Sequence, residues 1–264
     1  MAGERYFQLM GTAAGPGVPA FFCECAGCAE ARRDPQLSRA RCSARVHLDG
    51  ANLLIDPGPD LRQQLVRFEV GEIQEVFLTH WHHDHCGGLG ELEYYIQLHR
   101  RAPLRLHLPS GAMQPFLNAY PHLGEIFELV PWAWGEPMAC GNVTITGLEA
   151  NHGIETAGVL VRGDGVSIAY FPDTAGLPEA TLRRVEGVDW LICDATFTGE
   201  NWFPASHMTL SETIALGKAV HARHTVPTHF AVHFSDPVTH AELAALVVDE
   251  PDVRLAHDGM KIAL

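Results

Sequence analysis

The stretch FLTHWHHDHCGGLG, Phe77–Gly90, decides the fold of this chain. Apolar residues typical of a β-strand lead into four histidines and one aspartate, which fall within the six positions from His80 to His85. Side chains alternate along an extended strand, so His80 and His82 are predicted to project to the same side. Such crowding of imidazole rings is unfavourable unless they share a ligand, and the stretch therefore indicates a metal site.

The residues after His82 are predicted to serve a second metal. The chain is expected to turn there toward a helix beginning near Gly87-Gly88, and that turn would point Asp84 and His85 toward a second position. Imidazole and carboxylate ligands favour Zn, Mn or Fe, whereas Ca and Mg sites favour oxygen ligands alone. His83 is expected to be exposed. Histidines that only cap a strand end would not explain the H-x-H-x-D-H spacing.

Four ligands cannot complete two coordination shells, so further donors are expected at later strand ends. His152 follows the stretch VTITGLEAN, Asp173 follows SIAYFP, and His229 follows a short apolar segment. Each of these residues alone has an ordinary structural explanation, as a neighbour of a helix cap, a turn former or a buried histidine. Asp56 in LLIDPG also ends a strand, where it either orients a ligand histidine or forms a plain turn.

Length and composition favour a single globular unit. Of the 264 residues, 47% are hydrophobic and 19% are charged, so the chain can bury a large core and disorder is not expected. No repeat, low-complexity segment or linker divides the sequence. We predict one domain over residues 1–264.

Short strands and helices alternate irregularly, which predicts mixed sheet structure with helices on the outer faces. Turn signals at Asp49-Gly50, Gly163–Gly165 and Asp258-Gly259 indicate hairpins and antiparallel pairing. Strands are predicted at Phe7–Met10, Ala51–Ile55, Val76–Thr79, Leu104–Leu108, Val143–Leu148, Gly158–Val161, Ser167–Phe171, Trp190–Cys193 and Arg254–His257. Helices are predicted at Asp60–Phe68, Leu89–His99, Pro178–Val185, Leu210–Val220 and Thr239–Asp249, the fourth beginning at a capping box of Thr209 and Glu212.

The formal net charge of -14 argues against a long nucleic acid as partner, because such ligands are normally met by a basic surface. A small phosphate ester stays compatible, since bound metal ions can be the largest local charges in a site. The N-terminal MAGERYFQLMGTAAG has no apolar run suited to a signal peptide or a membrane span, so we expect a cytoplasmic protein without a membrane partner. A small basic group is expected to be solvated: Arg32, Arg33, Arg39, Arg41 and Arg45.

Seven cysteines, an odd number, suit a reducing compartment and a metal site better than a disulfide framework. Cys23, Cys25 and Cys28 have C-x-C-x2-C spacing, which fits a tetrahedral structural Zn that needs one more ligand. His233 in THFAVHF is the nearest candidate for that ligand. A buried cluster of reduced thiols and a redox site are the alternatives. We place this N-terminal zinc-binding loop at about residues 22–42.

The order and context of the seven candidate ligands resemble the metallo-β-lactamase superfamily. The resemblance covers nearly the whole chain and implies an α/β fold, the αβ/βα four-layer sandwich, with two mixed β-sheets flanked by helices. It also implies a ligand set for two divalent ions, Zn or Mn. His80, His82 and His152 would hold one ion, Asp84, His85 and His229 the other, and Asp173 would bridge them.

Further segments are similar to the PhnP-type cyclic-phosphate phosphodiesterases of the carbon–phosphorus lyase pathway in phosphonate metabolism. They are GTAAGPGVPAFFCECAGCAEARR, PDTAGLPEATL, SHMTL, THFAVHF and HDGMKIAL. This resemblance implies a structural Zn held by Cys23, Cys25, Cys28 and a histidine, and a homodimer. His233 lies four positions after His229, where the family pattern has three and this chain has Val232.

The implied reaction is hydrolysis of a small cyclic phosphodiester, either phosphoribosyl 1,2-cyclic phosphate or a 2′,3′-cyclic nucleotide. The hypothesis is that two metals share a hydroxide and align it for in-line attack on phosphorus. His207 and Asp84 are the expected catalytic residues, and His207 would give a proton to the leaving alkoxide. A surface histidine that only flanks the capped helix is the ordinary explanation of His207.

Several other functions remain open on sequence grounds. A hydrolase of the same fold could act on a thioester, a lactone or an RNA 3′ end, although no basic arm for RNA is visible. An oxidoreductase of pyrroloquinoline quinone biosynthesis has a similar fold and a cysteine-rich N-terminal Zn motif. A binding or sensor protein with a degenerate site is disfavoured, because all seven ligand types are intact.

Overall fold

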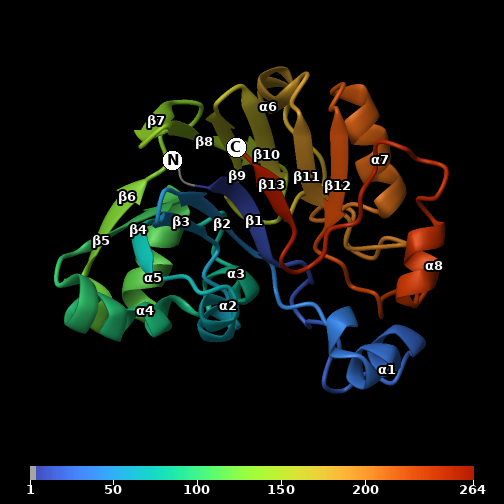
Figure 1. Ribbon diagram of the computed structural model, residues 1–264, viewed down its shortest axis with the longest axis horizontal. Coiled ribbons are helices and arrows are strands. Elements are labelled where there is room, and N and C mark those ends of the chain that lie inside the picture. Colours follow the sequence, from blue (N-terminus) through green and yellow to red (C-terminus); the bar gives the residue numbers. More distant parts are fainter. Residues whose placement is uncertain (1–3) are drawn as a thin grey trace.

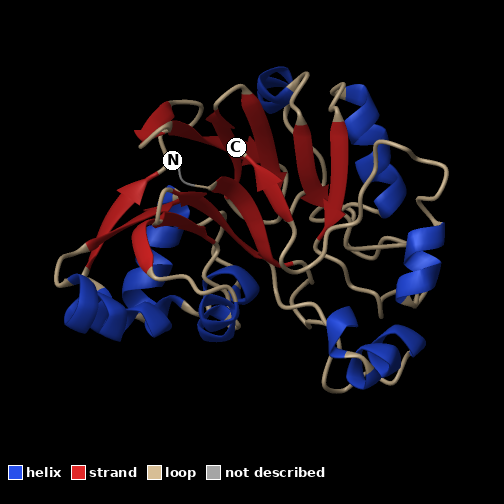
Figure 2. Ribbon diagram, viewed as in Figure 1, coloured by secondary structure: helices blue, strands red, loops and turns tan. Residues whose placement is uncertain are grey.

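The computed structural model describes residues 4–264, and it shows two mixed β-sheets flanked by helices. One sheet has seven strands in the order β13-β1-β2-β3-β4-β5-β6, and the other has six in the order β12-β11-β10-β9-β8-β7. Helices lie along the outer sides of the two sheets (Figure 1, Figure 2). The predicted metallo-β-lactamase fold is confirmed.

The seven-stranded sheet is antiparallel on one side and parallel on the other. Its strands are β1 (Arg5–Gly11), β2 (Ser43–Leu48), β3 (Ala51–Ile55), β4 (Glu72–Phe77), β5 (Leu104–Leu108), β6 (Phe127–Pro131) and β13 (Lys261–Ala263). The β2–β3 hairpin closes at Asp49-Gly50, where φ is 48° and 97°, as the two central residues of a type I′ turn require. From β3 to β6 the neighbours run parallel, so their carboxyl ends share one edge.

The six-stranded sheet has the same division. Its strands are β7 (Pro137–Cys140), β8 (Val143–Ala150), β9 (Thr156–Gly163), β10 (Val166–Phe171), β11 (Trp190–Asp194) and β12 (His224–Thr228). Strands β7 to β10 pair antiparallel, with the predicted turn at Asp164-Gly165, whereas β10, β11 and β12 run parallel. The carboxyl ends of these three parallel strands also lie at one edge.

Among residues 4–264, eight short α-helices connect the strands. They are α1 (Ala26–Arg33), α2 (Leu61–Arg67), α3 (His83–Cys86), α4 (Leu92–Tyr94), α5 (Met113–Ala119), α6 (Glu179–Val185), α7 (Leu210–Ala219) and α8 (His240–Ala245). Helix α7 begins at the predicted capping box, in which Thr209 and Glu212 exchange hydrogen bonds. Within residues 4–264, no helix is both long and apolar enough to cross a bilayer.

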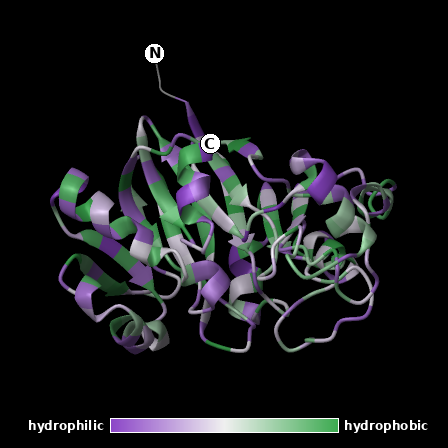
Figure 3. Cartoon of the chain, turned by 90° about the horizontal axis from the view of Figure 1, so that it is seen from below, coloured by the Kyte–Doolittle hydropathy of each residue, from purple (hydrophilic) through white to green (hydrophobic). Residues whose placement is uncertain are grey.

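Three hydrophobic cores separate the four layers. The central core joins residues of both sheets, such as Phe7, Val46, Val159 and Ile192. The other two cores lie between each sheet and its own helices. In Figure 3 the strands carry many of the hydrophobic residues, coloured green. Burial of this apolar surface holds the layers together and fixes the edge at which the strand ends meet.

The structure corrects four local predictions. Arg254–His257 forms no strand, although Ala256 N donates a hydrogen bond to Pro227 O of β12. The predicted helix Leu89–His99 is divided into a 3-10 turn at Leu89–Glu91, helix α4 and a π-helical segment at Tyr95–Arg100. Asp258-Gly259 closes no hairpin, and α8 ends at Ala245 instead of Asp249.

The helix expected near Gly87-Gly88 begins earlier, at His83. A Cβ atom added to Gly88 would lie 2.0 Å from the carbonyl oxygen of Gly58, and one added to Gly58 would lie 2.2 Å from that of Asp84. This close approach of two backbone segments requires glycine at both positions. It seats α3 against the loop after β3, so Asp84 and His85 lie on a helical turn.

Candidate metal centre

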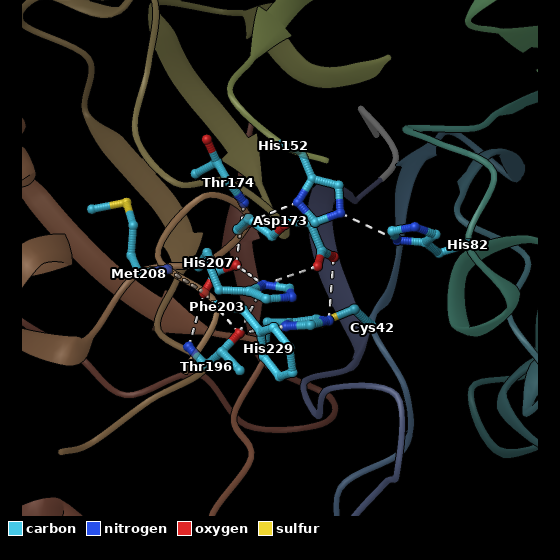
Figure 4. Close-up of polar contacts among 12 residues, drawn as sticks. Cys42, His82, His152, Asp173, Thr174, Thr196, Phe203, His207, Met208 and His229 are labelled. Atoms are coloured by element: carbon cyan, nitrogen blue, oxygen red, sulfur yellow. Dashed lines mark hydrogen bonds and ion pairs between the residues drawn. The ribbon is translucent and has the colours of Figure 1, made fainter. Parts of the chain in front are cut away.

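The candidate site lies at the edge where strand ends from both sheets meet. In open α/β sheets, ligands bind beyond the carboxyl ends of the strands. The side chains gathered here are Asp56 after β3, His80 after β4, His152 after β8, Asp173 after β10, Asp194 at the end of β11 and His229 after β12. Residues far apart in the sequence therefore share one site (Figure 4).

The first group of candidate metal-ligand atoms, called donors below, belongs to the imidazole rings of His80, His82 and His152. His80 Nε2 lies 3.0 Å from His82 Nδ1, which lies 3.2 Å from His152 Nε2. Outside the group, His80 Nδ1 lies 3.0 Å from Thr79 Oγ1, and His152 Nδ1 donates to the carbonyl oxygen of Ser206 at 2.7 Å. That bond fixes the tautomer of His152 and leaves its Nε2 lone pair directed inward.

The second group lies beside the first. Asp84 Oδ2 is 3.5 Å from both His85 Nε2 and His229 Nε2. Asp173 Oδ2 is 2.6 Å from His85 Nε2 and 3.2 Å from His229 Nε2, and a donor atom of Asp173 also lies within 4.8 Å of one on His80. Asp173 therefore stands between the two groups, and the structure brings together all seven candidate ligands.

Hydrogen bonds behind the donors orient the rings. His85 Nδ1 donates to Asp56 Oδ2 at 2.8 Å, and Asp56 also accepts from Thr79 N and Oγ1. His229 Nδ1 lies 2.8 Å from Thr196 Oγ1. Asp56 and His229 have φ of 54° and 59°, a left-handed conformation that is uncommon outside glycine and that clusters at functional sites. The sequence left open whether Asp56 orients a ligand histidine or only forms a turn, and its contact with His85 Nδ1 supports the orienting role.

The residues fit a pair of divalent ions. Three buried atoms at the centre, His85 Nε2, Asp173 Oδ2 and His229 Nε2, face one another and Asp84 Oδ2, and none has a hydrogen-bond partner outside this cluster among the described residues. Buried polar atoms are rarely left without partners, so these lone pairs indicate a bound cation. Imidazole nitrogens mixed with carboxylate oxygens suit Zn or Mn.

Burial and charge set the protonation of the donors. Burial lowers the pKa of His80, His82 and His152, so these rings are neutral and free to coordinate. Burial opposes ionisation of Asp84 and Asp173, but the neighbouring His85 and His229 lower the pKa of both carboxyls. Three rings are thus neutral and two carboxyls ionised, the forms that bind metals. Burial would lower the pKa of His85 as well, but Asp173, Asp84 and Asp56 raise it, so this ring must lose a proton before it coordinates.

His207 lies at the border of the cluster. Its Nδ1 atom is 2.7 Å from Asp194 Oδ2 and 3.4 Å from Asp173 Oδ1 (Figure 4). Burial would lower the pKa of His207, but the hydrogen bond to Asp194 outweighs it and raises the pKa to about 9. Asp194 also accepts hydrogen bonds from the backbone N–H groups of Thr174, Thr196 and Met208. This imidazole therefore holds a proton beside the donors at neutral pH.

Sequence reasoning missed Asp194 and Thr196, which orient His207 and His229. Asp194 follows the predicted strand Trp190–Cys193, so it has the same strand-end signal as Asp173. Thr196 Oγ1 lies 3.2 Å from His207 Nδ1 and donates to Asp194 Oδ1. A hydroxyl that acts through another side chain leaves no spacing pattern of its own.

The N-terminal cysteines form a separate cluster. The sulfurs of Cys23, Cys25 and Cys28 lie within 4.8 Å of one another, and Cys28 Sγ is 3.8 Å from His233 Nδ1. The segment predicted as a loop contains α1, whose N-cap Cys25 accepts a hydrogen bond from Cys28 N. His233 therefore faces the cysteines, whereas Val232 is buried in the central core. All seven cysteines are free thiols.

The expected solvated arginine group is wrong for two members. Arg39 and Arg45 are 6% and 4% exposed. Arg45 donates to Gln8, Tyr6, Asn52 and the carbonyl oxygen of Phe68, and Arg39 donates to Thr12 and the carbonyl oxygen of Ala256. Neither these two arginines nor any other Lys or Arg among residues 4–264 forms an ion pair with the seven candidate ligands, Asp194 or His207.

The fold and the cluster of candidate ligands define a class of metal-binding proteins, and comparison gives the family. Residues 51–230 match the family described as the beta-lactamase superfamily domain, so the chain belongs to that superfamily and is a hydrolase of the metallo-β-lactamase fold.

Three proteins illustrate its similarities. A diphosphatase of the PhnP family is 26% identical with a TM-score of 0.85, covering 98% of each chain. The Zn-bound PqqB structure from Methylobacterium extorquens is 23% identical with a TM-score of 0.81, covering 98% of this chain and 100% of that one, and it shows the fold. Coenzyme PQQ synthesis protein B of Methylobacterium radiotolerans is 29% identical over 229 residues, which cover 71% of this chain and 72% of that protein.

Proposed function

We propose that the chain is a metal-dependent phosphodiesterase that hydrolyses a small cyclic phosphodiester, a phosphoribosyl 1,2-cyclic phosphate or a 2′,3′-cyclic nucleotide. The observation that carries this proposal is the 2.7 Å contact between His207 Nδ1 and Asp194 Oδ2, which holds this imidazole beside two groups of candidate metal ligands. A proton donor at that place suits a leaving alkoxide. Similarity to a PhnP-family diphosphatase supports phosphoester chemistry.

The seven donors would hold two divalent ions, Zn or Mn, and the cysteines with His233 would hold a structural Zn. When bound, the active-site ions would polarise a phosphoryl oxygen and lower the pKa of water. Asp84 would orient the attacking water by accepting a hydrogen bond at a carboxylate oxygen. Asp173 would keep the two groups of donors together through its contacts with His85 and His229.

His207 would give its proton to the leaving oxygen. Asp194 keeps the imidazole protonated, and it also fixes the ring orientation because Nδ1 is the atom it engages. The opposite ring atom, Nε2, is then the one that donates. General acid assistance of this kind contributes roughly 10²–10⁴-fold to rate.

A function in coenzyme PQQ synthesis is the second candidate. Relatives named coenzyme PQQ synthesis protein B share 29% identity over 229 residues with this chain. The same ligand set would hold the metal of an oxidoreductase in that synthesis. That alternative needs no acid for an alkoxide leaving group, so His207 distinguishes the two.

One panel of substrates tests the proposal. Protein loaded with Zn or Mn is assayed with bis(p-nitrophenyl) phosphate, 2′,3′-cyclic nucleotides, phosphoribosyl 1,2-cyclic phosphate, a thioester and a lactone. We expect turnover of the cyclic esters that falls in His207→Ala at unchanged metal content. Activity confined to the thioester or the lactone contradicts the phosphodiesterase proposal, as does inertness toward every phosphodiester.

A further inference from the structure

Two exposed aromatic side chains lie in the loop that carries His207. Trp202 and Phe203 precede it between β11 and α7, and they are 50% and 56% exposed. The loop is held by local hydrogen bonds. Asn201 accepts from Phe203 N at 2.9 Å and donates to the carbonyl oxygen of His207 at 2.8 Å, while His207 N donates to the carbonyl oxygen of Phe203 at 3.0 Å. The two aromatic residues are thereby fixed relative to His207.

Trp202 and Phe203 pack against other aromatic rings. Trp202 lies 5.5 Å from Phe234 and 6.1 Å from Phe197, measured between ring centroids, and Phe203 lies 6.3 Å from Phe197. Phe197 is fully buried, and its ring is 6.4 Å from that of His207. Figure 4 draws Phe203 together with His207, whose backbone N–H donates to the carbonyl oxygen of Phe203. The rings are thus packed on one side while half of their surface faces solvent.

The metal ligands and His207 offer no contact for the part of a substrate that lies beyond the phosphodiester. The donors and His207 account for a phosphoryl group and a leaving oxygen, and no Lys or Arg among residues 4–264 pairs with them. Single exposed apolar residues are common on protein surfaces. Two half-exposed rings that both pack on Phe197 and belong to the loop of His207 are different. Flat aromatic surfaces stack on nucleobases without regard to sequence.

We infer that Trp202 and Phe203 form a stacking platform for the nucleobase of the substrate, so the site favours a 2′,3′-cyclic nucleotide over a cyclic ribose phosphate that lacks a base. This inference rests on the proposed phosphodiesterase function and narrows it. The phosphodiester sits at the donors, and the base lies on the rings beside His207. The platform contributes to substrate binding and takes no part in proton transfer.

The test compares two esters that differ only in the base, 2′,3′-cyclic AMP and ribose 2,3-cyclic phosphate, on the metal-loaded full chain. For Trp202→Ala combined with Phe203→Ala, we expect KM for the cyclic nucleotide to rise roughly 10- to 100-fold while kcat is retained. KM for the base-free ester should stay within about twofold of the parent, a difference worth about 0.4 kcal/mol. Trp202→Phe combined with Phe203→Tyr retains the rings and should restore nucleotide KM.

Tyr94→Ala provides the matched control, because Tyr94 is 69% exposed on α4, away from the donors. Equal changes in KM for the two esters, or none for either, overturn the platform. Turnover of neither ester overturns the proposed function instead. In that case tryptophan fluorescence decides the inference: quenching by 2′-AMP in the parent that disappears in Trp202→Phe supports the platform, and no such difference refutes it.

Discussion

Asp194 Oδ2 lies 2.7 Å from His207 Nδ1, and this contact joins the end of β11 to the loop that precedes α7. The same carboxylate accepts from Thr174 N, Thr196 N and Met208 N, so it holds several segments in place as well as the imidazole. His207 therefore has a fixed orientation toward Asp173 and the donor cluster. The role of His207 therefore depends on Asp194 of strand β11, which lies outside this loop.

Replacing His207 or its partner Asp194 should lower turnover without removing metal. We expect His207→Ala to reduce kcat on a cyclic phosphodiester by roughly 10²–10⁴-fold, most of all for poor leaving groups. Asp194→Asn should cost less, and the double variant should resemble His207→Ala alone because the two residues act as a unit. Additive losses in the double-mutant cycle would show that Asp194 acts independently. Elemental analysis and unfolding curves check each variant, and loss of metal from His207→Ala would identify His207 as a ligand.

Asp56→Asn should weaken metal binding while preserving the backbone. Asparagine tolerates the left-handed conformation that Asp56 adopts, but its amide cannot replace the charge that holds His85 Nδ1 at 2.8 Å. Loss of such an orienting carboxylate typically lowers metal affinity about 10- to 100-fold. Competition with a chelator dye measures the affinity. Asp60→Asn, which lies at the N-cap of α2 and pairs with Arg41, is the matched control. Unchanged affinity in Asp56→Asn would contradict the orienting role.

Cys23→Ser should remove one kind of metal and spare the other. The cysteine cluster and the histidine cluster use different residues, so the variant is expected to lose about one Zn per chain while retaining the active-site pair. Elemental analysis at defined protein concentration gives the stoichiometry. Cys140→Ser is the matched control, because Cys140 lies at the end of β7 outside any donor group. Loss of all metal from Cys23→Ser would show that the two clusters do not fill independently.

Glu75 should make stability depend on pH. The hydrogen bond from His107 at 2.6 Å is the main cause that lowers the pKa of Glu75 below its ordinary value of 4.5. A carboxyl with a lowered folded-state pKa stabilises the fold above its unfolded pKa, and this contribution is lost as pH falls through the folded pKa. The difference in unfolding free energy between the parent and Glu75→Gln should therefore shrink from about pH 6 to about pH 3. Urea unfolding at several pH values measures it, and a constant difference would contradict the assignment.

The donor cluster was predictable because its signals are local. The motif from His80 to His85 concentrates ligands in one segment, and His152, Asp173 and His229 each directly follow a strand. The strands at Ala51–Ile55 and Leu104–Leu108 were predicted with their observed bounds. The short, mainly apolar run ANLLI and the apolar–polar alternation of LRLHL, both bounded by turn residues, are sufficient evidence for these elements.

Other elements depend on partners that are remote in sequence. Strand β12 contains Pro227, which argues against a strand, but β12 lies at the edge of its sheet, where proline is tolerated. Strand β2 contains Arg45, whose burial depends on acceptors such as Gln8 and Tyr6 on β1. Helix α3, which begins at His83, packs where the backbones of Gly58 and Gly88 approach closely. No local pattern shows any of these contacts.

The placement of the donors at the seam between the sheets has a consequence for assembly. His80, His82, Asp84 and His85 follow β4 in one sheet, whereas His152, Asp173 and His229 follow strands of the other. Neither half of the chain can complete the centre alone, so its formation must await docking of the two halves. Binding of the cations would then stabilise the contact between the two sheets. Removal of the cations would weaken that contact before either sheet unfolds.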